Sequence, residues 1–141
     1  MRFMCITKGL LAIVFSITFS NAYAGEDYIC TIERVYRADA EAGTIYDAYQ
    51  KQYLGKTFTV ERTSGVMTGA LKNSHVTAPQ VIDYGSTDNS YKVVTTMRKE
   101  QGAGAGSSIS ALNISEYETT TKKPFVFMSG ADVFIGKYVH F

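Results

Sequence analysis

Short segments of alternating apolar and polar residues fill most of this chain, and their close spacing limits the folds that it can adopt. Alternation with a period of two is typical of strands that bury one face. Parallel strands need crossovers of about a dozen residues or more, and most of the turn-rich links here are shorter. The sequence predicts a mainly β fold: an antiparallel meander of about seven or eight short strands, curled into a barrel-like sheet or a sandwich. The predicted strands are residues 28–36, 57–62, 66–71, 80–84, 90–98, 109–117, 124–128 and 133–141.

The clearest predicted hairpin covers residues 57–71. A turn at residues 63–65 ends in Gly65, where a positive φ is expected. Gly69, in the middle of the return strand, indicates a bulge or the close approach of a neighbouring backbone. The alternation puts four apolar side chains on one buried face and two polar ones toward solvent. These are Phe58, Val60, Met67 and Leu71 on the buried side, with Arg62 and Thr68 on the other.

Residues 41–53 depart from the alternation. Ile45, Tyr49 and Tyr53 recur at four-residue spacing, which predicts one short helix here. Asp39 is suited to cap its start and Gly55 to end it. A helix this short is marginal alone, so its tyrosines must pack on the sheet. The alternative for these residues is a polar loop or an irregular strand.

The first 24 residues have the three parts of a secretory signal peptide. Arg2 and Lys8 carry the charge, residues 9–20 form an uncharged apolar run, and a small-x-small site ends at Ala24, before Gly25. The run is too short to span roughly 30 Å of hydrocarbon, and an uncleaved membrane anchor is the alternative. We expect residues 1–24 to be removed and residues 25–141 to form a single exported β-rich domain, periplasmic or secreted.

The charge of the expected mature domain is nearly balanced. Removal of Arg2 and Lys8 leaves 14 − 2 = 12 Lys and Arg residues against 13 Asp and Glu residues. The basic residues are dispersed along the chain. This balance gives no reason to expect nucleic acid or an anionic membrane surface as a partner.

Cys30 is the cysteine that remains once Cys5 leaves with the signal peptide. It cannot form a bridge within the mature chain, although exported domains often use disulfides. Tyr28, Cys30 and Ile32 fall on one side of a predicted strand, which favours a buried thiol. The alternative is a reactive thiol or one paired between chains.

No catalytic motif is evident, so we expect neither an enzyme nor a cofactor or metal. The two histidines, His75 and His140, are not spaced from each other or from Cys30 as zinc ligands are. Asp83, Asp88 and Asn89 offer oxygen ligands for calcium, but they do not match the twelve-residue calcium loop, and these residue types also make ordinary turns. An enzyme would need a site assembled by the fold, for which Cys30, His75 and Asp83 are the candidates.

The leading functional prediction is a soluble binding or inhibitory protein. Long polar loops at residues 72–79, 85–89 and 99–108 are placed on a rigid sheet, and binding residues concentrate on such loops. The partner is either a protein, such as a secreted enzyme that the chain inhibits, or a small ligand or envelope glycan. The predicted ligand-binding residues are Asp83, Tyr84, Asn89 and Lys92.

The carboxyl end supports an alternative. Val133, Ile135, Val139 and the terminal Phe141 alternate on one face, and this pattern resembles the closing strand of bacterial outer-membrane β-barrels. The resemblance implies a small outer-membrane-associated barrel. Lys137 interrupts the apolar face, where a lipid-facing lysine costs roughly 2–4 kcal/mol near the bilayer midplane. Most upstream segments are also shorter than the roughly 9–11 residues of a spanning strand, so membrane association is not favoured.

Overall fold

The computed structural model describes residues 27–38, 43–73, 77–102 and 106–140. They form one eight-stranded antiparallel sheet and one α-helix, so the mainly β prediction is confirmed. The elements in chain order are β1 (Tyr28–Arg37), α1 (Thr44–Tyr53), β2 (Thr57–Val60), β3 (Met67–Gly69), β4 (Gln80–Tyr84), β5 (Tyr91–Met97), the 3₁₀ turn η1 (Lys99–Gln101), β6 (Ser108–Ile114), β7 (Lys123–Ser129) and β8 (Asp132–His140).

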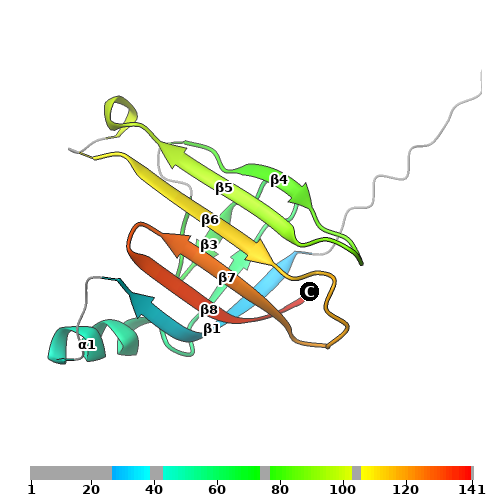
Figure 1. Cartoon of the computed structure of the whole chain (residues 1–141), viewed down its shortest axis with the longest axis horizontal. Coiled ribbons are helices and arrows are strands. Elements are labelled where there is room, and N and C mark those ends of the chain that lie inside the picture. The colour runs from blue at the N-terminus through cyan, green and yellow to red at the C-terminus, as the bar shows by residue number, and fades with distance from the viewer. Residues whose placement is uncertain (1–26, 39–42, 74–76, 103–105, 141) are drawn as a thin grey trace, which may run out of the picture.

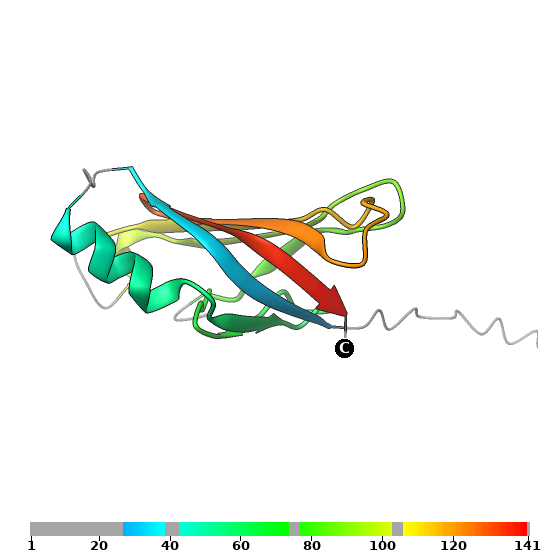
Figure 2. The same cartoon turned by 90° about the horizontal axis from the view of Figure 1, so that it is seen from below.

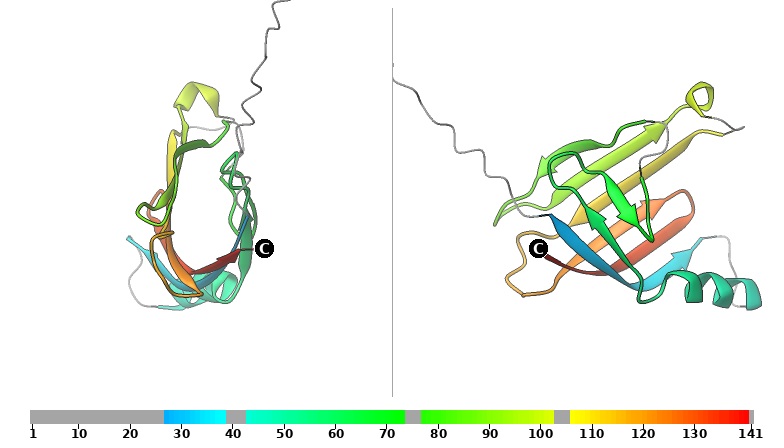
Figure 3. Two further views of the ribbon diagram at one scale, coloured as in Figure 1. Left: turned by 90° about the vertical axis from the view of Figure 1, so that its right-hand side faces the viewer. Right: turned by 180° about the vertical axis from the view of Figure 1, so that it is seen from behind.

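The strands run in the order β3-β2-β1-β8-β7-β6-β5-β4, so the first and last strands of the chain are neighbours (Figure 1). The link from β3 to β4 passes from one edge of the sheet to the other. The sheet is curled into a half-barrel: β2 and β3 face β4, β5 and β6 across a trough, and β1 and β8 form its floor (Figure 3, left). Of the two predicted arrangements, the structure therefore has the curled, barrel-like sheet, in the form of a half-barrel.

Apolar side chains from the concave face fill the trough. The four apolar residues predicted to share a face in the 57–71 hairpin are all in this core, and Thr68 is exposed as expected. The ring of Phe58 meets that of Phe125 edge-on, with centroids 5.2 Å apart. The core residues are Tyr28, Cys30, Ile32, Val35, Phe58, Val60, Met67, Leu71, Tyr91, Val93, Leu112, Ile114, Phe125, Phe127, Phe134 and Tyr138.

Two glycines allow close contacts between strands. Gly65 has a φ of +74°, as predicted, and a Cβ there would lie 2.7 Å from Cγ1 of Val93, so the link from β2 to β3 packs on β5 across the trough. A Cβ on Gly136 would lie 1.9 Å from the carbonyl oxygen of Thr31. Gly136 therefore lets β8 approach β1 at the centre of the sheet.

Helix α1 lies beside β1 at one end of the half-barrel (Figure 2). Its residues Tyr49 and Tyr53 pack against the core, as expected. The one helix predicted around residues 41–53 is confirmed, and it begins at Thr44. The hydroxyl of Tyr46 donates a hydrogen bond to the carbonyl of Val35 at 3.0 Å and fixes the helix to β1. The N-cap is Gly43, whereas the expected cap Asp39 lies outside the described residues.

Cys30 is fully buried and has a free thiol, as the favoured interpretation predicted. Burial raises the pKa of this thiol. The predicted signal peptide, with its cleavage site at Ala24 and Gly25, lies outside the described residues. Among those described, no helix has both the length and the apolar character needed to cross a membrane.

Candidate functional site

The two ends of the half-barrel differ in chemistry. At the end where β1 begins and β8 finishes, the side chain of Glu116 is buried. Tyr28 donates a short hydrogen bond to its Oε1, and Nη1 of Arg62 donates to the same oxygen at 2.9 Å. His140 lies on the other side, with Nε2 3.8 Å from Oε2. The rings of Tyr28 and Tyr138 meet edge-on, with centroids 5.0 Å apart, beside this hydrogen-bonded carboxylate. We therefore interpret the cluster as structural.

The prediction that Arg62 faces solvent is wrong. Strand β2 ends at Val60, so the alternation no longer sets the direction of Arg62. Its side chain turns inward and is 17% exposed, and Nη2 donates a hydrogen bond to the carbonyl oxygen of Tyr84 at 2.6 Å. The Arg62 guanidinium also lies 5.6 Å from the ring centroid of Tyr28. It therefore links β2 to β4 across the trough.

The four predicted ligand-binding residues lie together on the β4–β5 hairpin. Asp83 and Lys92 are cross-strand partners, and Nζ of Lys92 lies 3.4 Å from Oδ2 of Asp83. The backbone N–H of Gly85 donates to Oδ1 of Asp83 at 2.9 Å. This bond, assisted by Lys92, holds the pKa of the Asp83 carboxyl below its usual value.

The other two predicted residues of this hairpin, Tyr84 and Asn89, form hydrogen bonds to nearby loop residues. Tyr84 is 57% exposed, and its hydroxyl donates to the carbonyl of Thr63 at 3.4 Å. The backbone N–H of Asn89 donates to Oγ of Ser86 at 3.2 Å, as in an ordinary polar turn. The hairpin groups these four residues, but the three cavities described for this structure are lined by other residues.

The residues suggested for a fold-assembled enzyme site lie in different parts of the molecule. Cys30 is inside the core on β1, and Asp83 is on the edge strand β4, with four strands between them in the sheet order. His75 lies outside the described residues. Within the described ranges, no three His, Cys, Asp or Glu side chains are grouped as metal ligands would be.

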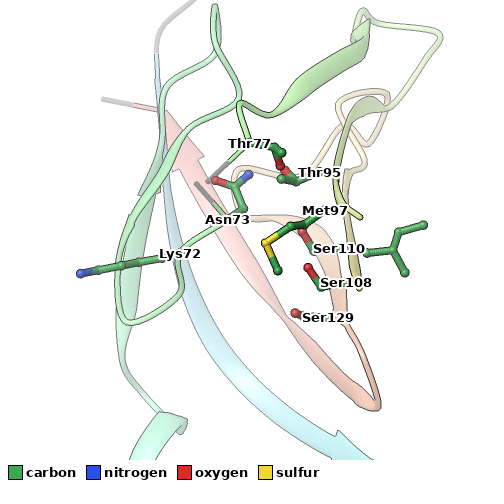
Figure 4. Close-up of a pocket in the computed structure, with 9 residues that line it drawn as sticks. Lys72, Asn73, Thr77, Thr95, Met97, Ser108, Ser110 and Ser129 are labelled. Carbon is green, nitrogen blue, oxygen red and sulfur yellow. The ribbon is translucent and has the colours of Figure 1, made fainter. Parts of the chain in front are cut away.

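The opposite end of the half-barrel is open and contains a cavity of about 70 Å³. One side of it is formed by Thr95, Ser110 and Ser129, which are successive cross-strand partners on β5, β6 and β7, together with Ser108. Asn73 and Thr77 lie on the other side, and Met97 extends between the two groups (Figure 4). Lys72 also lines the cavity, although its ammonium group points away from it (Figure 4). We call this space the hydroxyl cavity.

Two polar groups of the hydroxyl cavity already have partners. Oδ1 of Asn73 accepts a hydrogen bond from the N–H of Met67 at 2.9 Å, and Nδ2 donates to the carbonyl of Gly65 at 2.8 Å. Thr77 donates to the carbonyl of Thr96 at 2.5 Å. These bonds fix the β3–β4 link as one wall of the cavity.

The hydroxyl of Thr95 has different surroundings. Its Oγ1 is buried, and no residue in the described part of the chain forms a hydrogen bond with it. A buried polar group without a partner is uncommon and indicates an additional partner, such as ordered water or a ligand. The cavity beside Thr95 is large enough for several waters or a small polar group.

A second cavity of about 300 Å³ adjoins the first and shares Lys72 and Ser129 with it. It runs between α1, the end of β3 and the β7–β8 hairpin, and we call it the aromatic groove. Four of its rings form a continuous ladder, with centroids 5.0 to 6.0 Å apart from one ring to the next. The ladder consists of Tyr49, Tyr53, Phe134 and Phe127.

Asp132 is the acidic residue of the aromatic groove. The hydroxyl of Tyr49 donates to its Oδ2 at 2.6 Å, and Nη1 of Arg37 lies 3.6 Å from its Oδ1. Burial and the neighbouring Asp132 raise the pKa of Tyr49, so the phenol stays protonated and remains a donor. The carboxylate is thus held in a fixed orientation.

The residues that line the open end are not among the binding residues predicted from the sequence. The sequence does contain one indication of this site, which is polar residues at inward-facing strand positions. Thr95 alternates onto the same face as Tyr91 and Val93, and Ser110 onto the same face as Leu112. Inward-facing positions of an antiparallel strand are usually apolar. Comparison with protein-family models, with curated proteins and with solved structures gave no match.

Proposed function

We propose that this protein is a small exported binding protein, not an enzyme, and that its ligand enters the open end of the half-barrel. The observation that carries the proposal is the hydroxyl cavity with the buried, unpartnered Thr95 hydroxyl. Binding sites are concave and place a few polar groups against an apolar lining. The hydroxyl cavity and the aromatic groove together have this composition, and rigid strands and α1 hold their side chains in place.

The opposite end is less suited to binding. Its carboxylate, guanidinium and phenol groups are already paired with one another around Glu116. A ligand there would have to displace a buried ion pair, whose separated charges are costly to leave without partners. The open end supplies hydroxyls from the hydroxyl cavity and an aromatic surface from the groove, so a ligand can bind there with the Arg37–Asp132 pair left in place.

The test uses an isotope-labelled chain of residues 25–141 and a panel of small polar compounds, including polyols, sugars and amino acids. We expect amide shifts in two-dimensional NMR spectra to concentrate at Thr95, Ser110 and Ser129. Thr95→Val keeps the shape of the side chain but removes the hydroxyl, so it should weaken binding while leaving the fold intact. Thr96→Val, at an exposed position next in sequence, is the matched control.

Two results would contradict the proposal. Shifts confined to the β4–β5 hairpin would move the site to Asp83, Tyr84, Asn89 and Lys92. Equal binding by the wild type and Thr95→Val would show that the cavity hydroxyl takes no part.

Export is tested separately by fractionation of cells that express the full chain. We expect a protein shortened by 24 residues that osmotic shock or the culture medium releases. Extraction only with detergent would favour the outer-membrane alternative.

A further inference from the structure

We propose that the ligand is a neutral carbohydrate and that the aromatic groove holds one sugar ring against Tyr53. This inference rests on the proposed binding function and deepens it by naming the ligand class. A pyranose ring has an apolar face of C–H groups and a rim of hydroxyls. The groove offers both kinds of contact, because its lining combines aromatic rings with the polar residues Ser129 and Asp132.

The aromatic side is rigid. Tyr53 is partly buried, and its ring centroid lies 5.0 Å from that of Tyr49 and 5.1 Å from that of Phe134. Its phenol ring lines the groove near the end of α1, where the helix is packed on the core. A ring held in this way loses little conformational entropy when a flat apolar surface binds against it.

The polar side can recognise hydroxyls. Ser129 and Asp132 line the groove from the β7–β8 hairpin. Oδ1 of Asp132 accepts no hydrogen bond from the described residues, although Nη1 of Arg37 lies 3.6 Å from it. An exocyclic hydroxyl of a sugar in the groove could extend into the hydroxyl cavity, where it would meet the serine side chains.

The charges favour a neutral ligand. Arg37 already occupies the cationic position, with its guanidinium carbon 5.4 Å from the ring centroid of Tyr49 and with an ion pair to Asp132. A second cation would compete with this arginine, and an anion would be repelled by the Asp132 carboxylate. An uncharged sugar neither competes with Arg37 nor is repelled by Asp132. The volume of about 300 Å³ is at the lower end of the range for small-molecule sites, which suits one ring with its neighbours outside the groove.

The experiment titrates isotope-labelled residues 25–141 with cellobiose, chitobiose, maltose and lactose, and with polyols and amino acids as the non-sugar panel. We expect at least one disaccharide to shift the amides of Tyr49, Tyr53, Ser129 and Asp132. Tyr53→Ala should weaken that binding about tenfold, whereas Tyr53→Phe, which keeps the ring, should bind like the wild type. Tyr36→Ala removes an exposed tyrosine on the sheet and is the control.

The amide shifts of the wild type still test the inference if Tyr53→Ala does not fold. Asp132→Asn is a second variant, in which the new side chain has the same shape as aspartate. No shift with any sugar at tens of millimolar would overturn the carbohydrate inference. If non-sugar compounds alone shift the residues of the open end, the ligand class is wrong but the proposed binding function stands. Sugar shifts confined to the convex face or to the β4–β5 hairpin would also overturn the inference.

Discussion

The guanidinium of Arg62 donates a 2.9 Å hydrogen bond to the Glu116 carboxylate, although 54 residues separate them in the chain. The pair joins the end of β2 to the segment that follows β6, and so connects the two walls of the trough. The Glu116 side chain is 8% exposed and that of Arg62 is 17% exposed, so solvent screens their interaction only weakly.

Loss of the arginine is therefore expected to be costly. Arg62→Met should lower the free energy of unfolding by about 3–5 kcal/mol, because it leaves a buried carboxylate without its main cationic partner. Urea denaturation measures the change. Lys92→Met breaks the more exposed pair with Asp83, which solvent screens, and should have little effect. Equal effects of the two variants would show that the Arg62–Glu116 pair is not buried in solution.

Gly136 should tolerate no side chain. In Gly136→Ala the new Cβ would meet a backbone carbonyl, which cannot move without separating β1 from β8. We expect a loss of about 4 kcal/mol or more in the free energy of unfolding, in the range seen for severe single substitutions, measured by urea denaturation or by loss of soluble protein. Gly106→Ala is the control, because a Cβ there meets no atom within 4 Å. Similar stability of the two variants would contradict the register of the central strands.

Truncation of Phe58 tests how well its side chain is packed in the core. Its side chain is 1% exposed, so Phe58→Ala should cost about 3–5 kcal/mol through lost burial and the cavity that remains. Tyr117→Ala removes a ring that is 48% exposed and should have little effect. Denaturant unfolding of both variants gives the comparison. A wild-type midpoint for Phe58→Ala would mean that the Phe58 ring is not packed on Phe125 in the core.

Alkaline pH should unfold the protein steeply. Burial raises the pKa values of Tyr28, Tyr49, Tyr91 and Tyr138, whereas tyrosines in an unfolded chain ionise near pH 10. Below about pH 10 these phenols are protonated in both states and their contribution to stability is fully present. Above about pH 10 these four phenols lose their protons in the unfolded state but keep them in the folded state. The free energy of unfolding therefore falls as the pH rises. Tyrosinate absorbance should therefore increase together with the loss of β-sheet circular dichroism. Ionisation of all tyrosines before any unfolding would exclude these shifts.

Local patterns predicted the strands because the alternation and the turn residues are properties of short segments. The 57–71 hairpin illustrates this: the inward positions of Phe58 and Met67 and the positive φ of Gly65 follow from neighbouring residues alone. The same reasoning failed for Arg62. Its orientation depends on Glu116, a residue that only the tertiary fold brings within reach.

The proposed binding site at the open end could not be predicted from the sequence for a related reason. Its lining comes from α1, from the ends of β3, β5 and β7 and from the starts of β6 and β8. No segment contains enough of these residues to form a motif, and serine and threonine near strand ends are easily interpreted as turn chemistry. The exposed β4–β5 hairpin is continuous in sequence, so its polar residues were the ones that a local pattern could select.

The pairing of β1 with β8 in the middle of the sheet has a consequence for how the chain folds. One part, from β1 to β3, and another, from β4 to β8, are held in one sheet by this pairing, in which Tyr28 lies opposite His140. Contacts between residues so distant in sequence form slowly, because the loop must close first. During synthesis, the core cannot be completed until the final nine-residue strand has emerged. A chain that ends before β8 would keep two unfinished sheets whose edges are open to other chains.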